Sequence, residues 1–173
     1  MKHRILLIAS AILVVCALVA SSTRVFAANS KKKVTTQQNL KYFKRIVMST
    51  PYDVHFVQGD KNVVKLVGPQ AEVASVVLRV SGETLYIERA TRRSRMFFTS
   101  SDDVDIYVTS PDLTQLEIKG SGDFEANRRV DTDQLTVSIN GSGDIDFKDV
   151  ICDKLEASIS GSGDIDFGKV ECL

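Results

Sequence analysis

The chain has 173 residues, enough for one domain with a buried core; 43% of them are apolar and 25% are charged. This composition is ordinary for a soluble globular domain and excludes a wholly disordered chain. The 22 basic and 22 acidic residues balance, and the absence of tryptophan argues against a sugar-binding surface, because such surfaces usually recruit large aromatic side chains.

Residues 1–27 have the architecture of a secretory signal peptide. Lys2 and Arg4 precede an apolar run from Ile5 to Ala20, and Val25-Phe26-Ala27 places small residues at the −3 and −1 positions of a cleavage site. The run is shorter than the ~20 apolar residues of a membrane-spanning helix. We therefore expect an exported protein of the periplasm or cell surface, cleaved after Ala27 and without a transmembrane segment after signal removal. An uncleaved N-terminal anchor is the alternative.

Charge and cysteine content become more informative once the signal peptide is set aside. The remaining 19 basic and 22 acidic residues give a net charge of −3, divided into +5 over residues 28–111 and −8 over residues 112–173. This polarity is consistent with attraction of a partner or a head-to-tail self-contact, and equally with two solvated faces. Cys16 leaves with the signal peptide, so the exported chain keeps Cys152 and Cys172, a pair that suggests a disulfide.

Residues 28–40 are polar and basic without periodicity, and we expect them to form a flexible leader to a β domain over residues 41–173. Further along, short β-branched and aromatic runs with period-two alternation predict strands. The expected strands cover residues 45–48, 54–57, 62–67, 76–80, 84–88, 96–100 and 104–108. Ser81-Gly82-Glu83 predicts a hairpin turn, and Pro69 predicts the start of a short helix over residues 69–74.

Four arginines lie close together between two of the expected strands, at Arg89, Arg92, Arg93 and Arg95. Such a loop could grip phosphate or carboxylate groups, or it could be a solvated hairpin tip. No aromatic side chains alternate with the arginines, as they do on many nucleic-acid-binding surfaces, so we expect no nucleic-acid partner.

The C-terminal half contains a repeat of about twenty residues. Gly-Ser-Gly-Asp occurs three times, at spacings of 21 and 20 residues. The repeat-turn glycines are Gly120, Gly122, Gly141, Gly143, Gly161 and Gly163. Apolar residues recur at fixed offsets, so that Ile118, Ile139 and Ile159 each precede a turn. We expect the glycines to permit positive φ where the chain reverses.

Alternating apolar residues on both sides of each turn predict strands with one buried face. One unit cannot bury its own apolar face, whereas stacked units can. The predicted fold class is therefore all-β. We expect a right-handed parallel β-helix-like solenoid with coils of about 20 residues in the C-terminal half, and more irregular strands with a hairpin in the N-terminal half. A β-sandwich of hairpins is the rival fold, but it does not explain three identical turns.

Stacking of these coils predicts two further features. Cys152 and Cys172 would occupy one column about 5 Å apart, within the range for a disulfide that contributes about 3 kcal/mol. The last coil would expose an uncapped strand edge, which a second copy of the chain or another partner could cover. The sequence thus predicts a possible homo-oligomer through the C-terminal coil.

Two columns of carboxylates are the only chemically suggestive constellation. Asp123, Asp144 and Asp164 form one, and Glu125, Asp146 and Asp166 form the next. Like charges this close repel each other. Either solvent and hydrogen bonds from turn N–H groups relieve the repulsion, or calcium bridges adjacent coils, which would make the columns a ligand or metal ladder. We expect no other cofactor.

The sequence argues against an enzyme. His55 is the only histidine after the signal peptide, and alternation places it on the outward face of a strand between Val54 and Phe56. The sequence holds no Gly-x-Ser-x-Gly elbow, phosphate loop or Cys/His metal cluster. We therefore predict no catalytic residues and no resident metal.

Three motifs together resemble one known family. They are the repeated Gly-Ser-Gly-Asp-(Ile/Phe) turn, Tyr52-Asp53-Val54-x-Phe56-Val57-Gln58-Gly59 and Ser110-Pro111-Asp112-Leu113-x-x-Leu116. Over residues 42–173 the chain resembles the bacterial head GIN domain family of auto-transporter adhesins. The resemblance implies an exported or cell-surface protein with a β-helix-like fold, and it supplies no ligand and no catalytic residues.

The resulting interpretation is an exported, non-catalytic envelope or cell-surface protein. It would act as an adhesin-like binding module for an unknown envelope protein or polysaccharide. A structural or sensory periplasmic protein with protein partners is the first alternative, and an enzyme that acts on polysaccharide is the second. Fold alone does not decide between them.

Overall fold

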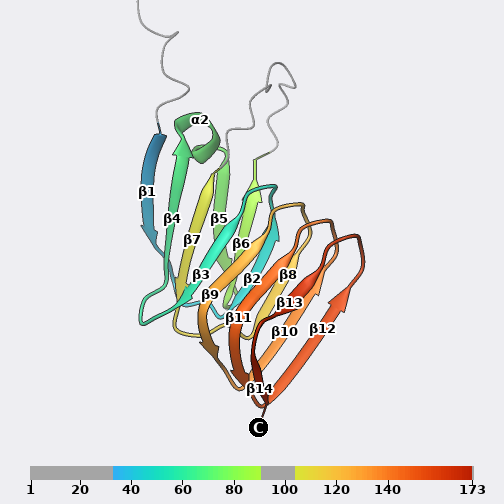
Figure 1. Cartoon of the computed structure of the whole chain (residues 1–173). Helices are drawn as coiled ribbons and strands as arrows, with labels where there is room; N and C mark the ends of the chain where they lie inside the picture. Colours follow the sequence, from blue (N-terminus) through green and yellow to red (C-terminus); the bar gives the residue numbers. More distant parts are fainter. Residues whose placement is uncertain (1–32, 91–103, 173) are drawn as a thin grey trace, which may run out of the picture. The chain divides into compact units, whose positions relative to one another are not determined.

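The fold is all-β and consists of two sheets that share one hydrophobic core (Figure 1). The structure, a computed structural model, describes residues 33–90 and 104–172. Within these residues the chain forms strands β1 to β14 and the short helix α2. No described helix has the length and apolar character that crossing a membrane requires.

Sheet A and sheet B have the following members. Sheet A contains β1 (Lys33–Asn39), β3 (Val54–Gln58), β4 (Val63–Pro69), β7 (Asp105–Ser110), β9 (Phe124–Asp131), β11 (Ile145–Cys152), β13 (Ile165–Phe167) and β14 (Val170–Cys172). Sheet B contains β2 (Arg45–Ser49), β5 (Val76–Ser81), β6 (Thr84–Arg89), β8 (Gln115–Ile118), β10 (Gln134–Ile139) and β12 (Lys154–Ile159). Helix α2 (Gln70–Val73) follows β4, with Pro69 at its N-cap position.

The two sheets combine parallel and antiparallel pairs. Sheet A has the strand order β1-β4-β7-β3-β9-β11-β13, with β14 also paired to β11, and sheet B has the order β12-β10-β8-β2-β6-β5. The pairs β1–β4, β4–β7 and β5–β6 are antiparallel, and the other pairs are parallel. The predicted all-β class is therefore confirmed. Because the sheets are mixed and not closed, they do not support the finer expectation of a right-handed parallel β-helix.

From β7 onward the chain alternates between the sheets and stacks one winding on the next. The windings are β8 with β9, β10 with β11, and β12 with β13 and β14 (Figure 1). Equivalent residues of the repeat are direct neighbours in the parallel register: Ile139 lies opposite both Ile118 and Ile159, and Cys152 lies opposite Cys172. The predicted columns of equivalent side chains are therefore confirmed.

One winding lies in the middle of both sheets although it comes first among the windings in the chain. It consists of β2 and β3, joined by the turn Thr50-Pro51-Tyr52-Asp53. β2 pairs with β6 on one side and β8 on the other, and β3 pairs with β7 and β9 in the same way. The first winding is therefore covered on both sides by later segments.

The core between the sheets contains a row of aromatic rings. Phe56, Phe124 and Phe147 are at most 1% exposed, and Phe167 continues the row. Successive ring centroids are 5.4 to 5.9 Å apart, a normal distance for favourable aromatic contacts. Full burial of each ring stabilises the fold by about 2 to 3 kcal/mol, so this row is a main source of cohesion between windings.

The predicted hairpin is confirmed by the antiparallel pairing of β5 and β6. Gly82 and Glu83 have φ angles of 55° and 61°, and two successive positive φ angles are typical of a tight hairpin turn that matches strand twist.

Among the described glycines, Gly82 alone has a positive φ. The expectation that the repeat glycines supply positive φ is therefore wrong.

Residues 33–39, expected within a flexible leader, instead form β1. Main-chain hydrogen bonds pair this strand with β4, from Lys33 opposite Pro69 to Asn39 opposite Val63. All but one of its side chains are exposed, so hydrophobic periodicity gives no sign of this edge strand. The predicted signal peptide, the strand over residues 96–100 and the arginines Arg92, Arg93 and Arg95 lie outside the described residues.

Candidate functional site: the carboxylate ladder of sheet A

The repeated Gly-Ser-Gly-Asp turns lie against one another at one end of the strands. A Cβ atom added to any of the six repeat glycines would lie between 1.9 and 2.4 Å from a main-chain oxygen of the neighbouring winding. Gly143, for example, faces Gly122 O, and Gly122 in turn faces Tyr52 O. These positions require glycine because the backbones of adjacent windings approach too closely for any side chain.

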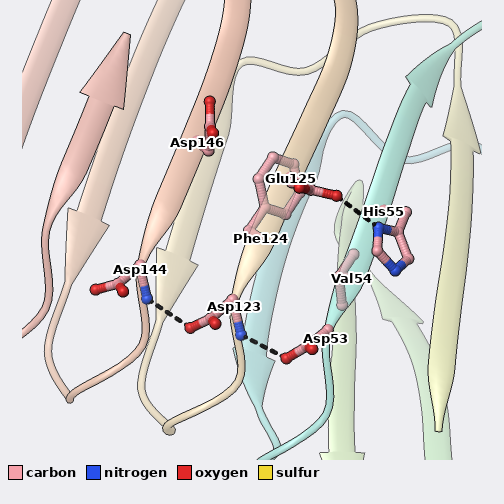
Figure 2. A pocket seen from close by; sticks show the side chains of 8 residues that line it. All are labelled: Asp53, Val54, His55, Asp123, Phe124, Glu125, Asp144 and Asp146. Atoms are coloured by element: carbon pink, nitrogen blue, oxygen red, sulfur yellow. Dashed lines mark hydrogen bonds and ion pairs between the residues drawn. The ribbon is translucent and has the colours of Figure 1, made fainter.

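The aspartate that follows each turn joins its winding to the next. Asp123 N–H donates to Asp53 Oδ1 at 3.1 Å, Asp144 N–H donates to Asp123 Oδ1 at 2.8 Å, and Asp164 N–H donates to Asp144 Oδ1 at 2.8 Å. Figure 2 shows the first two of these bonds. The column therefore has four members, and Asp53 is one that the search for Gly-Ser-Gly-Asp missed. The main-chain donors offset the repulsion between the carboxylates.

The second column lies two residues further along each strand. Asp146 lies opposite both Glu125 and Asp166, and His55 of the first winding lies opposite Glu125. His55 thus occupies the position that carboxylates hold in later windings. Its Nδ1 lies 3.0 Å from Glu125 Oε2, as Figure 2 shows. These residues lie on the outward face of sheet A, as the alternation of β3 predicts, since Val54 and Phe56 are buried.

The two columns line an open depression of about 220 Å³ on the surface of sheet A. Its lining consists of Asp53, Val54, His55, Asp123, Phe124, Glu125, Asp144 and Asp146 (Figure 2). Two further contacts hold His55 in place, in addition to Glu125. Its Nε2 lies 3.9 Å from Asp105 Oδ1, and its ring stacks on the Tyr107 ring with 5.0 Å between the ring centroids. Tyr107 also lies beneath the Lys65 ammonium group, 5.5 Å from the ring centroid.

In this arrangement the aspartates join each winding to the next. Within residues 33–90 and 104–172, no three His, Cys, Asp or Glu side chains converge in a way that could hold a metal ion. Calcium binding by the ladder therefore stays a prediction without a preformed site. His55 bonds to a carboxylate and to no described hydroxyl or thiol, so the described residues hold no nucleophile–histidine pair at this position.

Cys152 and Cys172 meet at the edge of the last winding. Cys152 Sγ and Cys172 Sγ lie 3.6 Å apart, and both are thiols in this structure. Burial, followed by the hydrogen bond with Cys172, raises the pKa of Cys152 to about 11. Cys172 is exposed, so its sulfur is the one accessible to an oxidant. The disulfide stays a prediction, and the geometry places its two sulfurs side by side.

A polar cluster that the sequence did not reveal connects the first winding to α2 and β6. The Tyr52 hydroxyl donates to Glu72 Oε2, and Arg89 Nη2 donates to the same oxygen at 3.0 Å. Burial, followed by the bond with Glu72, raises the pKa of Tyr52. One of the four clustered arginines, Arg89, is therefore part of the structure of this cluster.

A family profile with the description "Putative auto-transporter adhesin, head GIN domain" matches residues 42–171. Comparison with curated protein sequences gives no match. A solved structure from Parabacteroides merdae, named a putative adhesin, has a TM-score of 0.72 and 18% identity, over 80% of this chain and 57% of that one. A second, from Parabacteroides distasonis, is named a putative lipid binding protein, with a TM-score of 0.72 and 21% identity over 83% and 61% of the two chains.

A third solved structure, from Bacteroides fragilis and named a putative adhesin, has a TM-score of 0.56 and 18% identity, over 83% of this chain and 99% of that one. This chain spans less than two thirds of the length of the first two structures. At these identities the structural similarities show a shared fold. Because the family profile covers most of its length, the chain belongs to the head GIN domain family.

Proposed function

We propose that this chain is an exported, non-catalytic binding module of the bacterial cell surface, of the adhesin type. The observation that carries the proposal is the register of the stacked windings. It repeats outward side chains along sheet A, with Glu125, Asp146 and Asp166 directly opposite one another. A surface that repeats one chemical group suits many weak contacts with a repetitive partner, whose combined strength exceeds that of each contact.

Family membership supports this proposal, as do the two solved relatives named putative adhesins. The partner would be an envelope protein or a polysaccharide with cationic or hydrogen-bond-donating groups, because the outward rows of sheet A offer mainly carboxylate acceptors. The parallel register sets the spacing of these acceptors at about 4.8 Å per strand. A partner with a matching repeat would engage several of them at once.

The test compares retention of the exported protein on whole bacterial cells, host cells and isolated envelopes. A Glu125→Gln/Asp146→Asn variant neutralises two outward carboxylates of sheet A and leaves the last winding unchanged. We expect it to bind about tenfold more weakly than the unaltered protein, which corresponds to about 1.4 kcal/mol. The matched control, Glu88→Gln/Glu117→Gln, removes two outward charges from sheet B and should bind like the unaltered protein.

Three outcomes would contradict the proposal. Equal loss of binding in both variants would assign the effect to net charge rather than to sheet A. Cross-linking of the protein to one envelope protein, without retention on surfaces, would favour a structural or sensory periplasmic role. Turnover of a purified polysaccharide would make the chain an enzyme.

Lipid binding is a second candidate, favoured by a groove between β1, β5 and α2. The groove has a volume of about 370 Å³, and its apolar lining includes Val34, Leu66, Val73 and Val76. One solved relative is named a putative lipid binding protein. Binding of the exported protein to lipid vesicles, lost in a Val76→Asp variant and retained in the sheet A variant, would support this candidate over the first.

A further inference from the structure

The last winding leaves apolar side chains uncovered at positions that earlier windings bury. Ile159 is 49% exposed, whereas Ile139, the equivalent residue one winding earlier, is 1% exposed. Val170 is 40% exposed, whereas its equivalent Val150 is fully buried. Phe167 is likewise only partly buried, although Phe147 is fully buried. The core columns therefore continue to a surface where the described residues provide no cover.

The main chain at this end is also unpaired on one side. β12 is the edge strand of sheet B, and β13 and β14 pair only with β11 in sheet A. Both sheets thus present an open edge at the same end of the stack (Figure 1). An open edge of this kind pairs readily with another strand, which would satisfy its N–H and C=O groups.

The sequence along the sheet A edge is complementary to itself when read in the antiparallel direction. If residues 165–170 pair with the same segment of a second copy, Ile165 lies opposite Val170, Asp166 opposite Lys169, and Phe167 opposite Gly168. Two apolar contacts, two opposite-charge pairs and two aromatic–glycine pairs result, all of them favourable across antiparallel strands. Asp166 and Lys169 are both exposed, and Lys169, which pairs with Glu171 of its own chain, would also contact Asp166 of the second copy.

We infer that the last winding is the dimerisation surface of this protein and that its occupant is a second copy of the chain. The two copies are related by a twofold axis perpendicular to the stacking direction. The same axis brings β13 of one copy beside residues 168–170 of the other, and β12 beside β12. Both sheets then continue through the interface, and the exposed apolar columns of the two copies cover each other.

A twofold arrangement fits better than head-to-tail assembly. The opposite end of the stack has β1 and β5 at its edges, and nearly all the side chains of β1 are polar and exposed. Contact with that end would leave the apolar columns against a polar strand. A twofold interface is also closed, so it yields a dimer rather than an open filament. The arrangement has one unfavourable contact, because Asp164 of one copy lies opposite Glu171 of the other. The ion pair between Lys169 and Glu171, at 2.5 Å, reduces this repulsion.

The test measures the mass of the exported protein by light scattering and sedimentation over a range of concentrations. We expect the unaltered protein to dimerise and Asp166→Lys to weaken dimerisation by about tenfold, because two attractive pairs become repulsive. The Asp166→Lys/Lys169→Asp double variant, which restores opposite charges across the interface, should recover most of this loss. Asp60→Lys makes the same charge change at an exposed site before β4, away from β12 and β13, and should leave dimerisation within about twofold of the unaltered protein.

Several results would overturn this inference. If the protein stays monomeric over a roughly 100-fold range of concentration that ends at its solubility limit, it has no such interface. Assemblies that grow beyond two copies would indicate head-to-tail contact. A dimer that tolerates Asp166→Lys, or one that the double variant fails to restore, would place the contact elsewhere. Circular dichroism of each variant separates loss of dimerisation from loss of folding.

Discussion

In the windings from β8 onward, the turn that connects the sheet B strand to the sheet A strand is Gly-Ser-Gly-Asp. The winding of β2 and β3 has Thr50-Pro51-Tyr52-Asp53 in the same place. Each later turn stacks on the main chain of an earlier one, and a Cβ at Gly120 or Gly122 would collide with Thr50 O or Tyr52 O.

This difference shows that only the later of two stacked turns requires glycine. Its Cβ atoms would meet the main chain of the earlier turn, whereas the earlier turn can carry side chains. Tyr52 uses this freedom to reach Glu72 and Arg89. The first winding is thus held by side-chain contacts, and the later ones by close backbone approach and by the aspartate ladder.

The largest effect should follow from a methyl group in a glycine turn. In Gly143→Ala the new Cβ would lie 2.2 Å from Gly122 O, so two windings must separate locally. We expect a loss of about 3 kcal/mol in the free energy of unfolding, measured by denaturant titration. Ser142→Ala, in the same turn but exposed, should change it by less than about 0.5 kcal/mol.

Gly82→Ala provides a second control, because Gly82 has a positive φ and no atom within 4 Å of the added Cβ. It should lose about 1 kcal/mol through backbone strain alone. If Gly143→Ala cost no more than Gly82→Ala, close approach would not be the reason for the repeat glycines.

The cysteine pair tests whether a covalent bond holds the last winding to the winding before it. We expect the exported protein to contain the Cys152–Cys172 disulfide, visible as an intact mass lower by two hydrogens. Its reduction should lower the free energy of unfolding by at most about 3 kcal/mol, because the bond closes a loop of moderate length. Two free thiols in freshly exported protein would contradict the prediction, and Cys172→Ser supplies the reduced reference.

The reduced protein should also respond to pH. The pKa of Cys152 is raised to about 11 in the folded protein by burial, so the unfolded chain loses this proton first as the pH rises. Stability should therefore fall between the ordinary pKa of a thiol, about 8.5, and pH 11. The oxidised protein has no thiol at this position, so it should lack this component of the pH dependence.

A smaller effect is expected at the turn of the first winding. Tyr52→Phe keeps the buried ring and removes the hydroxyl that bonds to Glu72. We expect a loss of about 1 kcal/mol in denaturant unfolding. Tyr86→Phe, on the outward side of β6, is the matched control and should be nearly neutral. Equal effects of the two substitutions would mean that the Tyr52–Glu72 bond does not hold the first winding to α2.

The sequence predicts the stack of windings well, because residues at equal offsets in the repeat become partners in neighbouring strands. Once Ile118, Ile139 and Ile159 are seen at equal offsets, their alignment in neighbouring strands follows. Asp53 was missed because its turn has no glycine. The apolar alternation of Val54 and Phe56 around His55 matches that of the later windings and could have identified it.

Other features leave no local pattern in the sequence. β1 has almost no apolar side chain to bury, so only its main-chain pairing with β4 defines it. The position of β2 and β3 between later strands depends on contacts far apart in the chain, such as Val54 opposite Phe124. Hydrophobic periodicity identifies strands and faces, but it does not specify which distant strands become neighbours.

The central place of β2 and β3 also affects how the chain acquires its fold. These strands are synthesised before β6, β7, β8 and β9, yet both of their edges are completed only by those later strands. Pairing between segments this distant in sequence is slow, and the waiting strands expose apolar surface. Pairing of the central strands should therefore be complete only late, when β9 is present, and until then the N-terminal strands need protection from aggregation.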